Sequence, residues 1–334
     1  MKVKGLHNST KSSSLILTHG DSDGVCSGAI AKSAYPGSDV YFTSPVGILD
    51  ELELADGYSN IIICDIAVDE RACKKLYKRL TELSEASSVT YIDHHPLPGK
   101  CWDVDWLHHD VNICAAELTY KVFEKQLNRD IRRVAIYGAI GDYHDNTPSV
   151  REWLLDWDKR SLFYQAGTLI QALIYMGRNY NFKRKLLAPL SHDVIPSEIP
   201  DIPQLAKEGS HLEEMLRLRV KKQVESLDNL AYVIDPKGYM SKSAIFAASY
   251  GRRGVGIAAE YRYKKQVYDM SLRSRNGAAD LNRLLRTIAP RHGGTGGGHA
   301  SAAGARIPRD SFMKFLSDLD AAIGKEERKD TSEK

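Results

Sequence analysis

Short apolar runs that end in carboxylates or histidines constrain the fold of this chain most strongly. Residues 14–18, 60–64 and 89–92 are such runs, and a helical run from residue 131 ends in the same way. The polar residues that follow these runs are His19, Asp21, Asp23, Asp65, Asp93, His94, His95 and Asp142. Runs of this length are typical of parallel strands that are covered on both faces, and chemistry collects at the carboxyl ends of such strands. We therefore expect these polar residues to converge on one edge of a sheet.

The order of the expected elements predicts an α/β protein with two domains. A chain of 334 residues exceeds the size at which one hydrophobic core keeps growing. Strands and helices alternate at the start of the chain, which predicts a doubly wound parallel sheet. We expect a metal-binding catalytic domain at 1–190, a linker helix within 191–230, a smaller α/β substrate-binding domain at 231–324 and a charged, frayed tail at 325–334.

Several of the expected elements are less clearly marked by the sequence. In the first domain, residues 102–106 are interpreted as a further strand. In the second domain, the pattern predicts strands at 243–249, 266–274 and 302–307, helices at 256–263 and 279–288, and a glycine loop at 293–298.

Cysteine use, the first residues and the charge pattern indicate an ordinary soluble protein. The five cysteines form no Cys-x-x-Cys pair, which argues against a disulfide framework and a thiolate zinc site. The first residues lack the apolar core of a signal peptide, and no apolar run could cross a bilayer, so we expect a cytoplasmic location without membrane contact. Residues 231–309 hold 14 Lys and Arg against 4 Asp and Glu. This excess indicates a phosphate-binding surface or a merely solvated basic face.

The acidic and histidine residues of the first domain are candidate metal ligands. Mixed carboxylate and imidazole ligands suit manganese or magnesium, and several aspartates that face one another repel unless cations lie between them. Two divalent ions about 4 Å apart are the pattern of phosphate-ester hydrolysis. We expect Asp65, at the end of a central strand, to bridge them. Taken singly, an Asp-x-Asp-Gly turn is often only a helix cap, and His108 and His109 show that a histidine pair arises with no evident site.

A glycine-rich stretch and an arginine pair are the chemical signals of the second domain. Arg273 and Arg275 end an expected strand, and residues 293–298 hold five glycines before His299. Glycines let backbone N–H groups approach an anion, and arginine can grip a phosphate with two hydrogen bonds. A flexible hairpin is the alternative. The stretch lacks a Gly-Lys-Ser/Thr sequence, so nucleotide triphosphate hydrolysis of the Walker type is not supported.

Together these motifs resemble the DHH phosphoesterase superfamily with a DHH-associated C-terminal domain. Residues 19–24 look like its first motif, Asp65 its second, Asp93 to His95 its third, residues 138–142 its fourth, and residues 296–299 with 302–304 the signature of the associated domain. The resemblance covers most of the chain. The layout is similar to that of short archaeal RecJ-like exonucleases and nanoRNases.

The resemblance implies a role for each motif residue. The implied metal ligands are His19, Asp21, Asp23, Asp65, His94 and Asp142, around two Mn²⁺, with Mg²⁺ or Co²⁺ as alternatives. Asp65, His95 and Asp93 are the implied catalytic residues: His95 would contact the scissile phosphate or activate water, and Asp93 would support the histidine pair. The implied substrate-binding residues are Arg273, Arg275, Gly296, Gly297, Gly298 and His299.

The implied activity is that of a manganese-dependent phosphodiesterase that releases mononucleotides from single-stranded DNA or RNA. The alternatives are a nanoRNase-like enzyme that acts on short oligonucleotides, cyclic dinucleotides or phosphoadenosine phosphate, and a family II inorganic pyrophosphatase, which the glycine signature disfavours. A further reading from another class is a replisome component that binds the GINS complex, either active or as an inactive scaffold. Since every ligand position is filled, an active enzyme is favoured.

Overall fold

The computed structural model describes residues 13–99 and 103–332, and the chain divides into two units, Met1–Ser210 and His211–Lys334. The strands of the first unit are β1 (Ser14–Thr18), β2 (Asp39–Phe42), β3 (Asn60–Cys64), β4 (Ser88–Asp93) and β5 (Leu107–His109). Its helices are α1 (Ser22–Ala34), α2 (Ile48–Glu51), α3 (Cys73–Ser84), α4 (Ala115–Phe123), α5 (Arg132–Gly141), α6 (Pro148–Trp153), α7 (Lys159–Met176) and α8 (Tyr180–Ser191). Helix α9 (Ile202–Gln223) spans the division between the units.

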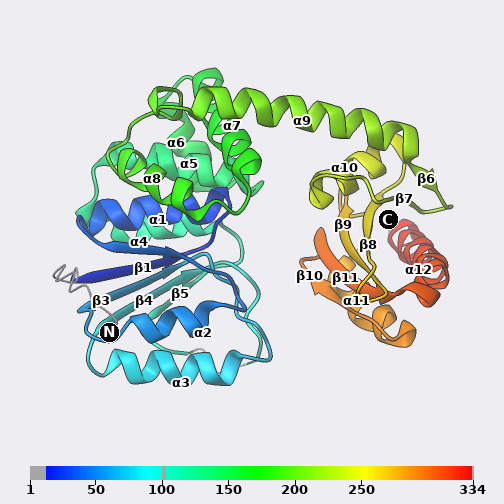
Figure 1. Ribbon diagram of the computed structural model, residues 1–334, viewed down its shortest axis with the longest axis horizontal. Helices are drawn as coiled ribbons and strands as arrows, with labels where there is room; N and C mark the ends of the chain where they lie inside the picture. Colours follow the sequence, from blue (N-terminus) through cyan, green and yellow to red (C-terminus); the bar gives the residue numbers. More distant parts are fainter. Residues whose placement is uncertain (1–12, 100–102, 333–334) are drawn as a thin grey trace, which may run out of the picture. The chain divides into compact units, whose positions relative to one another are not determined.

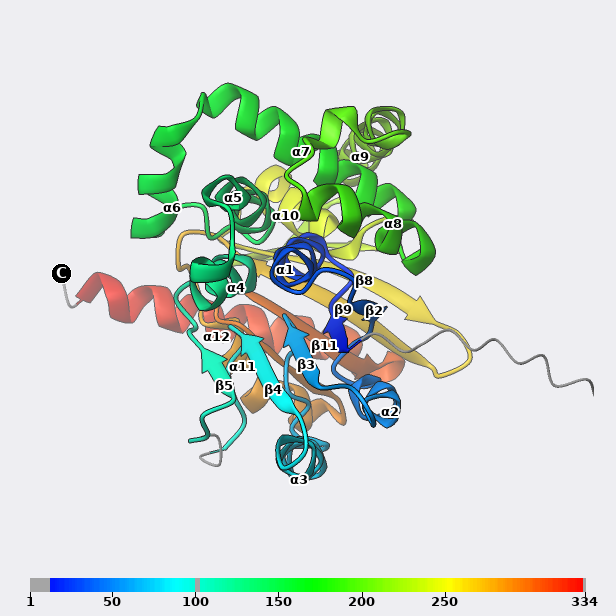
Figure 2. The ribbon, with the colours of Figure 1, turned by 90° about the vertical axis from the view of Figure 1, so that its left-hand side faces the viewer.

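The first unit is built on a parallel sheet whose strand order is β2-β1-β3-β4-β5. The chain moves from β1 to β2 on one side and then crosses to β3 on the other side of β1. The helices that follow β1 and β3 therefore lie on opposite faces of the sheet. Ligands of such sheets bind outside the carboxyl ends of the strands, at the point between β1 and β3 where the strand order reverses. Figure 2 shows the strands β5, β4, β3 and β1 side by side with their ends directed to the same edge.

The side chains of β1 show why helices cover both faces of this sheet. All five residues of β1 are buried, and successive side chains point to opposite faces. Ile16 packs in one apolar cluster with α1, α4 and α5, whereas Leu15 and Leu17 pack in another with α3 and the segment around α2. Figure 1 shows α1 and α4 on one face of the sheet and α2 and α3 on the other. The prediction of a doubly wound α/β sheet is confirmed.

The second unit is a mixed sheet with helices on both faces. Its strands are β6 (Glu225–Ser226), β7 (Leu230–Ile234), β8 (Val255–Arg262), β9 (Val267–Ser274), β10 (Thr295–Gly298) and β11 (Ala302–Pro308), in the order β10-β11-β9-β8-β7-β6. Its helices are α10 (Met240–Gly251), α11 (Leu281–Ile288) and α12 (Phe312–Ser332). Helices α11 and α12 pack on one apolar face, and α10 packs on the other with the last turns of α9.

Two predicted elements of the second unit are wrong, because helix and strand are exchanged. Residues 243–249 belong to helix α10, and residues 256–263 lie almost entirely in strand β8. Both stretches contain alanines, which do not by themselves separate a helix from a buried strand here. In the structure they allow close packing: a Cβ on Gly256 would meet the backbone of α10 at Ala244 and Ala248. Tertiary packing of small residues here overrides intrinsic propensity.

Three further predictions need correction. The strand expected at 102–106 lies instead at Leu107–His109, where it pairs with β4; Trp102 lies outside the described residues. The glycine loop forms strand β10, antiparallel to β11. Helix α12 continues to Ser332 through most of the expected frayed tail. Among the described residues, no helix is long and apolar enough to span a membrane.

Candidate active site

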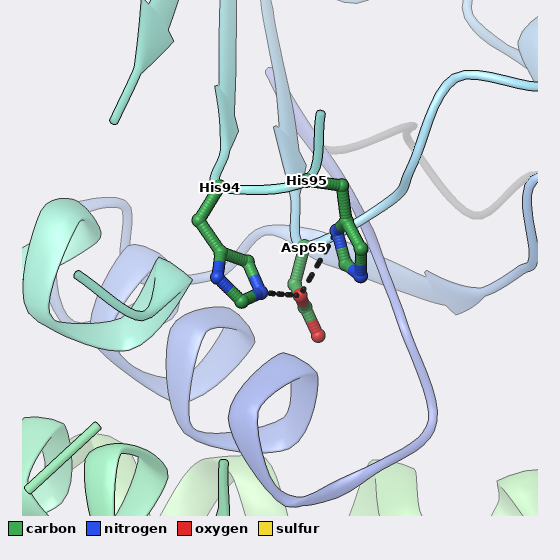
Figure 3. A group of neighbouring side chains, drawn as sticks. All are labelled: Asp65, His94 and His95. Atoms are coloured by element: carbon green, nitrogen blue, oxygen red, sulfur yellow. Dashed lines mark ion pairs between the residues drawn. The ribbon is translucent and has the colours of Figure 1, made fainter. Parts of the chain in front are cut away.

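Asp65 lies at the centre of the polar cluster that the sheet brings together. It follows β3, and His94 and His95 follow the neighbouring strand β4. Its Oδ1 lies 3.5 Å from His94 Nε2 and 4.0 Å from His95 Nδ1. Figure 3 shows the carboxylate directed between the two imidazole rings. The expected convergence of these residues on one sheet edge is thus present in the fold.

The environment of Asp65 is unfavourable for an ordinary carboxylate. Its side chain is 2% exposed, and its Oδ2 accepts no hydrogen bond from any described residue. Burial, reinforced by the Asp21 and Asp23 carboxylates, raises the pKa of Asp65 well above its usual value. The backbone is in the left-handed region, with φ of 57°, a conformation that is stored at functional sites at a cost of about 1–3 kcal/mol. A buried charge in this setting requires a partner of opposite charge.

The first-motif residues lie beside Asp65 on the loop from β1 to α1. Asp21 caps α1 by accepting a hydrogen bond from the Gly24 N–H, so the simple reading as a helix cap is correct for one of its oxygens. Its other oxygen lies 2.9 Å from His19 Nδ1, and His19 Nδ1 is 3.7 Å from Asp65 Oδ2. Burial lowers the pKa of His19, but the Asp21 and Asp65 carboxylates outweigh it and raise the pKa to about 11.

Asp23 is held by the start of helix α4. Its two oxygens accept hydrogen bonds of 2.8 Å from the backbone N–H groups of Ala115 and Ala116, where the helix dipole favours an anion. Its Oδ2 lies 3.8 Å from His94 Nε2. Burial and the Asp142 carboxylate raise the pKa of Asp23 to about 6, although His94 acts in the opposite direction.

Asp142 completes the cluster from the end of helix α5, together with a residue that the sequence reasoning missed. Asp142 Oδ2 lies 3.6 Å from His94 Nε2 and 3.0 Å from His144 Nδ1. The hydrogen bond to Asp142 raises the pKa of His144. The ring of His144 also packs edge to face on His94, at 5.5 Å between centroids. The signal was the Asp-x-His spacing directly after the fourth motif, which resembles His19-x-Asp21 in reverse.

Asp93 and His95 form a separate pair within the cluster. Asp93 is fully buried, and its Oδ1 lies 2.9 Å from His95 Nδ1 while its Oδ2 accepts a 3.3 Å hydrogen bond from the His95 N–H. Burial lowers the pKa of His95, but the bond to Asp93 outweighs it and raises the pKa. Asp93 therefore fixes the orientation of the His95 ring and leaves Nε2 as the ring's other polar atom.

The donor set of this cluster fits divalent cations. Within the described residues, three groups could each hold a metal ion, with ligand atoms that lie within 4.8 Å of one another. These groups are His19, Asp21 and Asp65; Asp65, His94 and His95; and His94, Asp142 and His144. Burial and neighbouring carboxylates raise the pKa values of Asp23 and Asp65, and carboxylates raise those of His19, His95 and His144. A bound cation would offset the repulsion between these carboxylates. Carboxylate and imidazole ligands without thiolate suit Mn²⁺ and Mg²⁺.

In the second unit, the predicted substrate residues lie at one end of the sheet. Arg273, near the end of β9, pairs in register with Ala302 of β11, and Gly298 ends the adjacent β10. The Arg273 guanidinium donates hydrogen bonds to Ser241 Oγ at 2.5 Å and to the Leu272 carbonyl at 2.9 Å. Arg275 is exposed just beyond β9.

Packing against α11 and β11 favours glycine at Gly296 of strand β10. A Cβ on Gly296 would lie 3.0 Å from Leu285 Cβ of α11 and 3.2 Å from the Gly304 carbonyl. His299 follows β10 directly, and its N–H bonds to the Ala302 carbonyl at 2.8 Å, which closes the turn to β11. Arg273, His299 and the Gly296–Gly298 backbone are thereby brought to one end of the sheet.

Residues 240–325 match the DHHA1 domain. The structure is similar to the pGpG-specific phosphodiesterase PggH of Vibrio cholerae, with a TM-score of 0.60 and 17% identity over 93% of this chain and 98% of that one. It is also similar to Mn²⁺-bound RecJ of Thermus thermophilus, with a TM-score of 0.65 and 17% identity over 93% of this chain and 52% of that one. The chain has the fold of the DHH phosphoesterase superfamily. The predicted resemblance to this superfamily is confirmed.

A further structure supports the DHH fold over nearly the full length of both chains. The exonuclease RecJ bound to manganese matches with a TM-score of 0.60 and 18% identity over 93% of this chain and 90% of that one. Among curated sequences, Mediator of RNA polymerase II transcription subunit 14 of Aspergillus niger is 27% identical over 176 residues. That match spans 45% of this chain but only 14% of the Mediator subunit, so it carries no functional argument.

Proposed function

We propose that this chain is a metal-dependent phosphodiesterase that releases mononucleotides from an end of single-stranded DNA or RNA. The observation that carries the proposal is the buried Asp65 carboxylate, whose Oδ2 has no hydrogen-bond partner among the described residues and whose neighbours are further carboxylates and imidazoles. The DHH phosphoesterase fold and the likeness to RecJ and to a phosphodiesterase support the same reading.

The first unit would hold two divalent cations, with manganese as the proposed ion and Mg²⁺ or Co²⁺ as alternatives. The proposed ligands are His19, Asp21, Asp23, Asp65, His94 and Asp142, with Asp65 shared between the ions. His144 is added as a candidate because it contacts Asp142. Bound cations would supply an ionised water at neutral pH and neutralise the phosphoryl oxygens.

His95 is the proposed contact to the scissile phosphate. Because Asp93 accepts a hydrogen bond from the Nδ1–H group of His95, the Nε2 atom can donate a hydrogen bond to an anionic oxygen when the ring is protonated. The hydrogen bond to Asp93 raises the pKa of His95 despite burial, and so favours this charged form. Asp93 is a positioning residue, since it holds the ring in one orientation and stabilises its positive charge.

The second unit is proposed to bind the terminal nucleotide. Arg275 is exposed, Arg273 is already oriented by Ser241, and Gly297 of β10 has room beside its backbone, since an added Cβ would meet no atom closer than 3.4 Å. Arginine and backbone N–H groups together recognise phosphate oxygens. The excess of basic residues at 231–309 supports the same role.

A dinucleotide or short oligonucleotide is the second candidate substrate. The chain matches 98% of a pGpG-specific phosphodiesterase but only 52% of the Thermus RecJ. The enzyme would then act on short strands and leave long ones intact. A GINS-type partner remains a prediction of the sequence resemblance, and a pull-down with GINS subunits would test it.

A time course with Mn²⁺ on end-labelled strands tests the proposal. Single-stranded DNA and RNA of about 5 and about 30 nucleotides, each labelled at either end, should lose mononucleotides stepwise. Cleavage of pGpG and the short strands alone would select the second candidate. Absence of cleavage of every substrate, including cyclic dinucleotides and pyrophosphate, would refute a phosphodiesterase. The same substrates are given to an Asp65→Asn variant, which should lose activity. Asp201→Asn is its matched control, because Asp201 is an exposed aspartate with a similar φ of 70°.

A further inference from the structure

Tyr143 is an exposed aromatic residue within the polar cluster of the first unit. It stands between Asp142 and His144, whose side chains contact each other at 3.0 Å, and Asp142 also faces His94. Tyr143 itself is 77% exposed, and its hydroxyl makes no hydrogen bond to any described residue. Its ring therefore contributes little to the core of the unit.

The backbone of Tyr143 is left-handed, with φ of 60°, because it ends helix α5 in a Schellman motif. The His144 N–H bonds to the Ala139 carbonyl at 2.8 Å, and the Tyr143 N–H bonds to the Ile140 carbonyl at 3.4 Å. This pattern places Tyr143 at the position where glycine is usual, since glycine adopts a positive φ without steric cost.

A tyrosine at this position is unexpected on structural grounds. The other non-glycine residues with positive φ in the described part of the chain are Asp65, Asp193, Asp201, Asp235, Lys237, Arg252, Gln266 and Asn276, all of them polar. Bulky residues are uncommon in this region, and Asn and Asp tolerate it best. Tyr143 thus has a strained backbone and an exposed ring at a position where glycine would stabilise the fold more.

The motif also fixes where the ring is attached relative to the cluster. The two cap hydrogen bonds hold the backbone from Ala139 to His144, and the side chains on either side of Tyr143 are held in the cluster by His94. The Tyr143 Cα is therefore a rigid anchor at the rim of the candidate active site. A tyrosine ring has few rotatable bonds, so it offers a flat apolar face at low entropic cost.

We propose that Tyr143 is a stacking platform for a nucleobase of the strand whose phosphate occupies the candidate active site. The inference rests on the proposed function and narrows its substrate to phosphodiesters that carry a base near the scissile bond. Stacking on an aromatic ring is tolerant of sequence, because every base has a π face. No hydrogen bond from the tyrosine hydroxyl is required, so phenylalanine would serve equally.

The binding of two matched single strands, one with and one without its terminal bases, tests this role. One probe is a five-nucleotide strand that is labelled at its central nucleotide. The other is the same strand with the bases of its first and last nucleotides removed. Binding of each is measured by fluorescence anisotropy in Ca²⁺. Tyr143→Ala should weaken binding of the intact strand by about tenfold or more, whereas Tyr143→Phe should bind it as the wild type does. The weakening should largely vanish with the strand that lacks terminal bases.

Two further variants separate stacking from misfolding and from general surface effects. Tyr143→Gly should lose binding as Tyr143→Ala does while its thermal midpoint stays at or above that of the wild type, because glycine adopts the required φ freely. Tyr164→Ala removes another exposed tyrosine of the same unit, on α7, and should bind both strands like the wild type.

The outcomes distinguish this inference from the proposed function. Equal binding of the intact strand by Tyr143→Ala and the wild type would overturn the stacking role, as would an equal loss for both strands or no binding by the wild type. Mn²⁺-dependent hydrolysis of bis(p-nitrophenyl) phosphate reports the phosphodiesterase separately. Hydrolysis by the wild type together with unchanged strand binding in Tyr143→Ala would contradict the stacking role alone. Weakened strand binding in Tyr143→Ala without any hydrolysis by the wild type would contradict the phosphodiesterase activity alone.

Discussion

At the scale of the residue, Asp65 combines burial, a left-handed backbone and an oxygen without a hydrogen-bond partner among the described residues. Each of these costs free energy in the protein without a bound ion, and a cation between Asp65 and its neighbours would offset the cost of burying the charge. The same reasoning makes asparagine the informative substitution, because Asn tolerates a positive φ and has the same shape without the charge.

We expect Asp65→Asn to fold and to lose activity. Removing the charge relieves repulsion from Asp21 and Asp23, so the metal-free variant should unfold at a temperature equal to or above that of the wild type. Turnover in saturating Mn²⁺ should fall by at least about 100-fold, the scale of losing a group that orients a catalytic centre. Substantial turnover in this variant, measured beside Asp201→Asn, would remove Asp65 from the reaction.

Sequence alone predicted the cluster residues that follow strands, and Asp142 at the end of α5, but missed His144 two residues later. Asp65, His94 and His95 were found because each follows a buried run, and parallel strands bring their carboxyl ends together. His144 was missed because it reaches the cluster through a helix cap, and the left-handed turn at Tyr143 has no glycine to mark it. The roles of these residues as ligands stay predictions.

At the scale of the element, the close approach of α5 to α1 and α4 shapes the site. A Cβ on Gly138 would lie 2.5 Å from Ala116 Cβ and 2.9 Å from Asp23 Oδ1, both rigidly held. The fourth motif thus supplies Asp142 as a candidate ligand and a glycine that gives the Asp23 carboxylate room. Helix α7 offers a contrast, since a Cβ on Gly167 would meet nothing within 4 Å.

We expect opposite effects from alanine at these two helical glycines. Gly138→Ala should destabilise the first unit by about 1–3 kcal/mol, because the neighbours of the added methyl cannot move freely. Gly167→Ala should stabilise it by about 0.5–1 kcal/mol, since alanine restricts the unfolded chain and favours the helix. Urea unfolding followed by circular dichroism measures both, and destabilisation of similar size in both variants would contradict the packing argument.

The elements of the first unit were predicted more accurately than those of the second for a physical reason. In the first unit, apolar runs that end in acidic or histidine residues mark β1, β3 and β4, whereas β5 has no such run and was predicted at the wrong residues. In the second unit, α10 and β8 are both rich in alanine and are packed so closely that side-chain size, and not periodicity, decides their structure. A single sequence carries no signal that separates the two.

At the scale of the whole molecule, the two units carry different chemistry. The carboxylate and histidine cluster lies in the first unit, and the arginines and glycine strand of the DHHA1 domain lie in the second. If the units unfold in separate transitions, a cation should stabilise the first alone, by about 2.7 kcal/mol at a concentration 100 times its dissociation constant. Calorimetry with and without Mn²⁺ should show one shifted transition, and the shift should vanish in Asp65→Asn. Equal shifts in both transitions would contradict this division.

The division also predicts different kinetic effects from the two units. Arg273→Ala should raise KM more than it lowers kcat, because its proposed phosphate lies away from the reacting bond. Asp93→Asn should instead lower kcat, because His95 loses the carboxylate that orients it. Steady-state kinetics on one labelled oligonucleotide compares the two variants directly. An unchanged KM in Arg273→Ala would remove its proposed role in substrate binding.

The number of manganese ions that the protein binds tests the proposed role of Asp65 most directly. Equilibrium dialysis followed by elemental analysis should give two Mn²⁺ per wild-type chain, and fewer in Asp65→Asn, with Asp201→Asn unchanged. Two ions in the wild type and fewer in Asp65→Asn would support a shared carboxylate at the end of β3. Absence of bound Mn²⁺ in the wild type, or full occupancy in Asp65→Asn, would contradict it.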